Sequence, residues 1–255
     1  MNPDPSICRV GDDFYLVTST FEYFPGLPVY HIKDLVHWKL IGHALSRPEN
    51  NPLMGCNASI GGQYAPTLRY HDGTFYVIGT NYGGKGSQGV FYVTAKNPAG
   101  PWSNPVWVGN WYVDPSIEFI DGKMYFLSPD NQGSFLLGVM DPETGTFVEP
   151  LRKVASGLGG SSPEGPHFYK IGDYYYMYST DAIFRENRKE AKEKGVPLGF
   201  IQMRRSKDLV NWEFLGWALP EIPQEAVEWV RSHAGGHGAT NIWAPYIIPY
   251  NNKYR

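Results

Sequence analysis

The sequence predicts an all-β chain folded as a five-bladed β-propeller, and three observations lead to this fold class. The first is a hairpin pattern that recurs five times along the 255 residues. The second is a composition with 29 Gly, 21 Pro and 15% aromatic residues, which suits short strands joined by tight turns. The third is a near-copy of residues 33–45 at residues 207–219, as expected when the outer part of one blade recurs in another.

Each recurring unit has a start that contains Pro, an apolar strand, a turn of Gly, Asp or Asn, and a second strand rich in aromatic residues. A turn of this kind between two apolar runs is the sequence signal for a tight β-hairpin. The five units start at Asp4, Ala65, Asp114, Glu164 and Ala244. A β unit that repeats in this way along the chain is typical of propeller blades.

The fifth unit reaches only the beginning of its second strand at Arg255, so we expect an incomplete fifth blade. Its open edge would allow pairing with another copy of the chain.

Residues 184–195 are rich in Arg, Lys and Glu and predict a short inserted helix, and residues 225–233 predict a further helical turn. The whole of residues 1–255 is assigned to a single propeller domain.

Composition limits the partners of the chain. Lys and Arg number 22 against 25 Asp and Glu, which gives a net charge of -3 and leaves no basic field for nucleic acid or an anionic membrane. The two cysteines cannot form a disulfide framework or a zinc site with four ligands. No long apolar run or signal segment is visible, so the chain as given is expected in the cytoplasm, with a secreted parent protein also open.

Three carboxylates open their units at a similar distance from the hairpin turn. Asp4, Asp114 and Glu164 each precede a turn residue by seven or eight positions, so the three side chains are expected to surround the propeller axis at one end. Like charges in a partly desolvated cleft raise at least one pKa. Cleavage of a glycosidic bond needs a protonated carboxylic acid and an ionised carboxylate side by side. The three acids are therefore the predicted catalytic residues.

The motifs around these acids resemble a known family. Asp4-Pro5-Ser6, Tyr64-Ala65-Pro66, Val113-Asp114-Pro115-Ser116 and Glu164-Gly165-Pro166-His167 resemble the signature of glycoside hydrolase family 43, and the resemblance covers nearly the whole chain. It implies a five-bladed propeller that inverts the anomeric carbon and requires no organic cofactor. It also implies that Asp4 is the general base, Glu164 the general acid, and Asp114 the acid that orients Glu164 and adjusts its pKa. The Asp4 and Glu164 carboxyl groups of an inverting enzyme should lie roughly 6.5 to 9.5 Å apart.

The same resemblance names residues that would contact the substrate. It places Phe24 and Tyr64 on the pocket for the non-reducing sugar, and His237 near the propeller axis, where some members hold a structural metal ion. A xylo- or arabino-oligosaccharide is the implied substrate, as in β-xylosidases and α-L-arabinofuranosidases.

Two other interpretations stay open. Ser206–Leu219 and Asn241–Pro245 resemble segments of arabinan-cleaving relatives, which keeps an endo-arabinanase and a chimera of two family members in consideration. A catalytically inert propeller, either glycan-binding or an engineered scaffold, is the alternative outside enzymes.

Overall fold

The computed structural model describes most of the chain. The described residues are 2–50, 61–83, 89–109, 113–130, 132–157, 162–182, 189, 193, 200–234, 236, 238–239, 242–250 and 253–254. Most of the helix expected at 184–195 therefore lies outside the described residues. The further helical turn is confirmed as helix α2, Gln224–His233.

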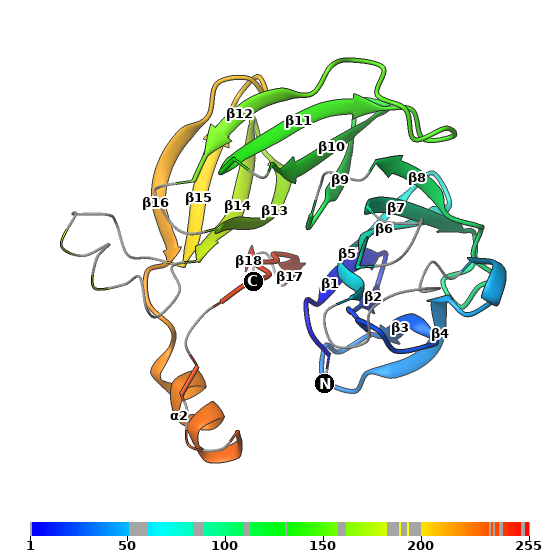
Figure 1. The fold of residues 1–255 in the computed structure, drawn as a ribbon, viewed down its shortest axis with the longest axis horizontal. Coiled ribbons are helices and arrows are strands. Elements are labelled where there is room, and N and C mark those ends of the chain that lie inside the picture. Colours follow the sequence, from blue (N-terminus) through cyan, green and yellow to red (C-terminus); the bar gives the residue numbers. More distant parts are fainter. Residues whose placement is uncertain are drawn as a thin grey trace.

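Four antiparallel sheets of four strands each follow one another along the chain and stand around a common centre (Figure 1). The first sheet contains β1 (Ser6–Val10), β2 (Asp13–Val17), β3 (Gly26–Ile32) and β4 (Lys39–Leu45), and a 3₁₀ turn, η1, follows at Pro48–Asn50. The second contains β5 (Gly62–His71), β6 (Thr74–Tyr82), β7 (Gly89–Ala95) and β8 (Val106–Gly109). The third contains β9 (Ser116–Ile120), β10 (Lys123–Pro129), β11 (Ser134–Met140) and β12 (Arg152–Ser156). The fourth contains β13 (Ser162–Ile171), β14 (Tyr174–Ala182), β15 (Ile201–Ser206) and β16 (Glu213–Leu219).

This arrangement confirms the predicted all-β propeller, with β1, β5, β9 and β13 as the innermost strands of the four sheets. A short hairpin of β17 (Pro249–Tyr250) and β18 (Lys253–Tyr254) lies near the centre, between the first and fourth sheets (Figure 1). Among the described helices, none is both long and apolar enough to cross a membrane.

The predicted tight turns join the two inner strands of each sheet. In the second and third sheets both turn residues have positive φ, 44° and 73° at Asp72 and Gly73, and 49° and 76° at Asp121 and Gly122. This is the pattern of a type I′ turn, whose twist matches that of the flanking strands. Two-residue loops of this kind fix the strand register, and therefore which side chains face the centre.

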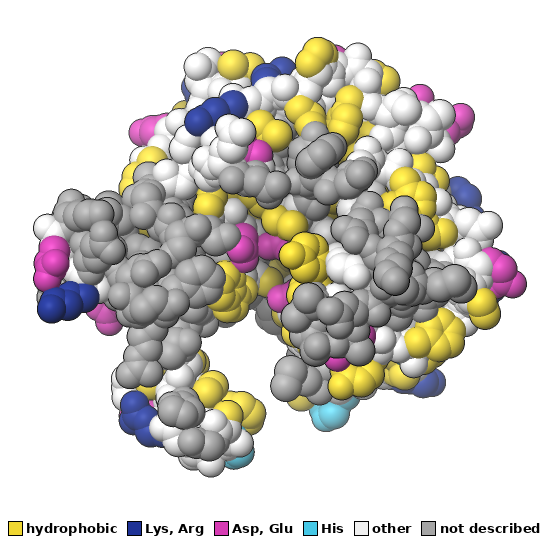
Figure 2. Space-filling view, viewed as in Figure 1, with side chains coloured by type: hydrophobic (Ala, Val, Ile, Leu, Met, Phe, Trp, Pro, Cys, Tyr) yellow, Lys and Arg dark blue, Asp and Glu magenta, His cyan; other side chains and the backbone are white. Residues whose placement is uncertain are grey.

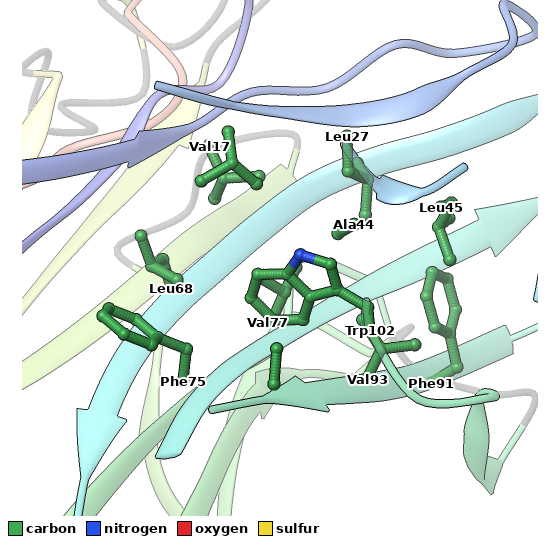
Figure 3. Close-up of a cluster of buried hydrophobic side chains, with 12 residues drawn as sticks. Val17, Leu27, Ala44, Leu45, Leu68, Phe75, Val77, Phe91, Val93 and Trp102 are labelled. Atoms are coloured by element: carbon green, nitrogen blue, oxygen red, sulfur yellow. The ribbon is translucent and has the colours of Figure 1, made fainter. Parts of the chain in front are cut away.

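The hydrophobic core lies between neighbouring sheets. Figure 3 shows the cluster between the first and second sheets, where Leu27 and Leu45 of the first sheet face Phe91 and Trp102 of the second. Trp102 is only 3% exposed. Each large side chain buried in this way contributes about 1.5–3 kcal/mol to stability. Equivalent clusters join the second sheet to the third and the third to the fourth.

An ion pair ties the innermost strands together below the face that carries the acids. The Arg69 Nε lies 2.9 Å from the Glu118 Oε2, and their side chains are 8% and 21% exposed. The guanidinium also lies 5.5 Å from the centre of the Tyr169 ring and 5.3 Å from that of Tyr246, and it donates a hydrogen bond to the Tyr246 hydroxyl. One cation thus joins β5, β9, β13 and the segment that leads to β17.

Arg69→Met is expected to lower the free energy of unfolding by about 3 kcal/mol, because it leaves the Glu118 carboxylate without its partner in a poorly solvated place. Urea unfolding would measure the loss. Arg205→Met is the matched control, since the Arg205 Nε lies 2.8 Å from the Glu213 Oε2 in a pair that is 35% and 61% exposed. The exposed pair should be worth less than about 1 kcal/mol. Equal losses in the two variants would contradict the role given to the central pair.

Candidate active site

The three predicted acids meet in one cavity. Figure 2 shows acidic side chains in a hollow at the centre of one face, with hydrophobic side chains beside them. A cavity of about 310 Å³ is lined there by Asp4, Asp114 and Glu164, which come from three different sheets. The structure therefore brings together the residues that the sequence grouped by their distance from a turn.

A repeated backbone conformation delivers these residues to the cavity. Asp4 and Asp114 precede a proline just before β1 and β9, and Ala65 and Gly165 precede one within β5 and β13. The φ angles of Asp4, Asp114, Ala65 and Gly165 are 49°, 45°, 40° and 54°. Asp occupies this left-handed region more readily than most residues. At Gly165 the backbone also passes close to the last segment, where a Cβ would lie 2.7 Å from the carbonyl oxygen of Trp243.

Glu164 does not share the backbone position of the two aspartates, and on this point the predicted alignment is wrong. Strand pairing sets Glu164 opposite Thr180 and Tyr64 opposite Thr80, so the equivalent of Glu164 in the second sheet is Tyr64. Both strands have an irregular register directly after this residue. A bulge of this kind turns the side chains at a strand end. The Glu164 side chain thus enters the cavity from the residue before Gly165, and it is Gly165 that occupies the backbone position of Asp4 and Asp114.

The environment of Asp114 favours its protonated form. Burial, together with the negative charges of Glu164 and Asp4, raises the pKa of Asp114 to about 7. A hydrogen bond from the Gly165 N–H to the Asp114 Oδ2, 3.1 Å long, acts in the opposite direction. The cavity therefore holds a proton among its three carboxyl groups near neutral pH. The same hydrogen bond attaches Asp114 to the residue that follows Glu164.

Aromatic side chains form part of the cavity wall. Tyr64 lines the cavity as predicted, and its ring centre lies 4.7 Å from that of Phe21, which lines it too. Phe24 is 53% exposed and is absent from the described lining, so the structure does not bring it to the carboxylates. Trp243 also lines the cavity. Trp243 was not among the predicted site residues, although Trp243-Ala244-Pro245 matches Tyr64-Ala65-Pro66 and could have identified it.

The histidines differ in what the structure shows. His167 lines the cavity, and burial together with the charge of Arg69 holds the pKa of this imidazole well below its ordinary value, so it is neutral at physiological pH. His237, expected near the axis, lies outside the described residues. Within the described ranges, no group of three or more His, Cys, Asp or Glu side chains is arranged to hold a metal ion.

The family model of glycosyl hydrolases family 43 matches residues 1–194, which include all three acids and their motifs. The chain belongs to glycosyl hydrolases family 43. Within this family 43 chain, the match covers the four innermost strands that carry the cavity.

Two curated relatives of this family 43 chain illustrate the similarity. It is 96% identical over 259 residues to a Bacteroides ovatus protein named non-reducing end alpha-L-arabinofuranosidase BoGH43B, a match that spans 100% of this chain and 48% of the relative. It is 41% identical over 200 residues to a Vibrio protein named xylan 1,3-beta-xylosidase, covering 73% of this chain and 37% of the relative. The chain thus spans less than half the length of each relative.

Solved structures agree with this placement. A Bacteroides ovatus structure titled xyloglucan PUL GH43B superposes with a TM-score of 0.74 and 82% identity, over 84% of this chain and 40% of that one. A xylan beta-1,4-xylosidase from Bacillus halodurans superposes with a TM-score of 0.69 and 31% identity, over 84% and 41% of the two chains. Because one relative matches the family 43 chain from head to tail, these similarities give no support to a chimera of two members.

Proposed function

We propose that this chain carries the catalytic site of an inverting glycoside hydrolase that releases arabinose or xylose from the non-reducing ends of hemicellulose-type glycans. The observation that carries the proposal is the cavity in which Asp4, Asp114 and Glu164 meet and hold a proton among them near neutral pH. Acid–base cleavage of a glycosidic bond requires such a divided set of carboxyl groups. The names of the relatives, an arabinofuranosidase and a xylosidase, support the choice of sugars.

In the proposed reaction the proton that the three carboxyl groups share resides on Glu164, which donates it to the glycosidic oxygen as the bond from that oxygen to the anomeric carbon breaks. Asp4 accepts a proton from a water molecule whose oxygen bonds to the anomeric carbon from the opposite face, and the configuration therefore inverts. Asp114 accepts a hydrogen bond from the N–H of Gly165, the residue that follows the acid, and so helps to hold Glu164 in place. The separation of roughly 6.5 to 9.5 Å between the Asp4 and Glu164 carboxyl groups stays a prediction.

Action at chain ends is the mode that the cavity favours over endo-arabinanase action. Its volume of about 310 Å³ lies near the lower limit for ligand pockets. Phe21, Tyr64 and Trp243 give it apolar walls on which a sugar ring can stack. We propose that these three aromatic residues bind the terminal sugar. Phe24 and His237 are kept as candidates for further contacts.

We further propose that the chain forms one domain in which residues 242–250 and 253–254 belong to a fifth blade. Three described contacts support this assignment. The Thr180 hydroxyl donates to the Ile242 carbonyl at 2.8 Å, the Tyr246 hydroxyl binds Arg69, and Ile248 packs against Phe14. Residues 242–250 therefore contact the fourth, second and first sheets.

Hydrolysis of aryl α-L-arabinofuranoside and aryl β-xyloside tests the function. Asp4→Ala is expected to reduce kcat/KM by about a hundredfold or more, since it removes the general base. Asp12→Ala, which alters a 93% exposed acid at the turn of the same sheet, is the control and should retain activity. Proton NMR of the first product should show the inverted anomer.

Three results would contradict the proposal or part of it. Equal turnover by Asp4→Ala and the unaltered chain would reject the mechanism, and a retained anomer would reject inversion. Release of internal fragments from linear arabinan, without terminal arabinose, would replace the exo-acting assignment by the endo-arabinanase.

A further inference from the structure

Ser19 connects Asp4 to the neighbouring sheet. Its side chain is 3% exposed and lies beside the cavity, between the first and second sheets. The Ser19 Oγ lies 2.5 Å from the Asp4 Oδ2, and the Ala65 backbone nitrogen lies 2.8 Å from the same Oγ. One hydroxyl therefore contacts both a cavity carboxylate and the backbone of β5.

The direction of these two hydrogen bonds is fixed by their chemistry. A backbone N–H can only donate, so the Ser19 Oγ accepts from Ala65. The single hydroxyl proton of Ser19 is then left for Asp4, whose carboxylate accepts it. A distance of 2.5 Å is typical of a strong hydrogen bond between a hydroxyl and a carboxylate.

The backbone on both sides of Ser19 is held independently of its hydroxyl. The Ser19 N–H donates to the Pro3 carbonyl at 2.9 Å, which fixes the residue before Asp4. Phe21 and Gln63 exchange two backbone hydrogen bonds of 3.0 and 2.9 Å, which hold the Ser19 segment against β5. Removal of the hydroxyl should therefore release the Asp4 side chain without separating the two sheets.

We propose that Ser19 is a positioning residue that orients Asp4 for its role as general base. By occupying the Oδ2 atom, Ser19 leaves the Oδ1 atom of Asp4 to accept the proton of the attacking water. A donated hydrogen bond also stabilises the ionised carboxylate that a base requires. This inference rests on the proposed function, because it assigns the geometry of the same site.

The chain offers a matched control in Ser6, two residues beyond Asp4. The Ser6 Oγ accepts a hydrogen bond of 2.8 Å from the Leu68 backbone N–H, just as Ser19 accepts one from Ala65 of the same strand. The Ser6 hydroxyl also hydrogen-bonds the Tyr246 side chain, and no carboxylate is a described partner of it. Ser6→Ala therefore removes an equivalent bond between the same two sheets, together with the Tyr246 contact, and leaves Asp4 untouched.

Kinetics of the two variants give the first test. In Ser19→Ala we expect kcat to fall about tenfold or more with KM changed less than twofold, because the base is misplaced while the sugar-binding walls are kept. Ser6→Ala should keep the kcat and KM of the unaltered chain. Unchanged kcat in Ser19→Ala, or equal losses in both variants, would overturn the proposal.

Crystal structures of the unaltered chain and of both variants give the second test and do not depend on turnover. We expect the Asp4 carboxylate to leave its position in Ser19→Ala only, because the hydrogen bond to its Oδ2 atom is lost. An unmoved Asp4 side chain in Ser19→Ala would overturn the role of Ser19. Failure of the unaltered chain to hydrolyse any substrate, with the Asp4 side chain displaced as expected, would reject the proposed function and keep the Ser19–Asp4 contact.

Discussion

Replacement of Glu164 by Gln is expected to slow hydrolysis of unactivated arabino- or xylo-oligosaccharides by about a thousandfold or more. The leaving oxygen of such a substrate is a poor leaving group and needs the proton that Glu164 supplies. Gln keeps the size and hydrogen-bonding oxygen of the side chain at the cavity wall, so the fold and substrate binding should persist. The measurement is kcat/KM on a defined oligosaccharide.

An activated substrate separates the roles of the two acids. The dinitrophenolate ion of a dinitrophenyl glycoside leaves without protonation. Glu164→Gln should therefore lose far less activity on this substrate than on the oligosaccharide. Asp4→Ala should lose activity on both, because water must be activated in either case. Glu149→Gln, which alters a half-exposed acid in the connection between β11 and β12, is the control. Equal losses of Glu164→Gln on the two substrates would contradict its role as general acid.

Asp114→Asn is expected to stabilise the fold at alkaline pH by on the order of 4 kcal/mol. The folded chain holds the pKa of Asp114 at about 7, above the ordinary value of 3.8, so it retains a proton that the unfolded chain has released. The unaltered chain therefore loses stability as pH rises from about 4 to about 7. Asn cannot ionise, and its amide oxygen can still accept from the Gly165 N–H.

The difference between Asp114→Asn and the unaltered chain should therefore grow between about pH 4 and pH 7, stay constant above that range, and vanish below it. Urea unfolding at intervals from pH 3.5 to 8 would measure it. Asp121→Asn is the control, since it makes the same chemical change at an 81% exposed turn residue of the same sheet. A difference for Asp114→Asn that is independent of pH would show that its burial or its neighbours differ from those described.

Sequence periodicity predicted the features that each blade specifies locally. Turn residues such as Asp72-Gly73 and Asp121-Gly122 identified the inner hairpins, because only a few residues tolerate positive φ at both turn positions. The regular position of the innermost strands then grouped Asp4 with Asp114. Glu164 was grouped with these aspartates correctly, but its predicted backbone position was one residue off. The alignment did not include the irregular register that follows Glu164.

Features that depend on contacts between blades could not be predicted in the same way. Ser19 belongs to a run of small polar residues, Thr18-Ser19-Thr20, and only the approach of β5 selects which of them meets Asp4. Arg69 and Glu118 are 49 residues apart, and nothing in either strand marks them as partners. Phe21 was overlooked in favour of Phe24 because the chain between them turns, which a linear pattern does not reveal.

The left-handed backbone conformation before the proline of each motif recurs in all four sheets, while the side chain at that position differs. Because four sheets present the same main-chain geometry to the cavity, the side chain at this position decides whether it supplies an acid. It is Asp in two sheets and Ala in the second, while the fourth has Gly and supplies Glu164 from the residue before it. A point substitution at Asp4, Ala65 or Asp114 can add or remove an acid while the scaffold stays intact, whereas a side chain at Gly165 would meet the Trp243 carbonyl. Related chains can therefore diverge in catalytic chemistry far faster than in architecture.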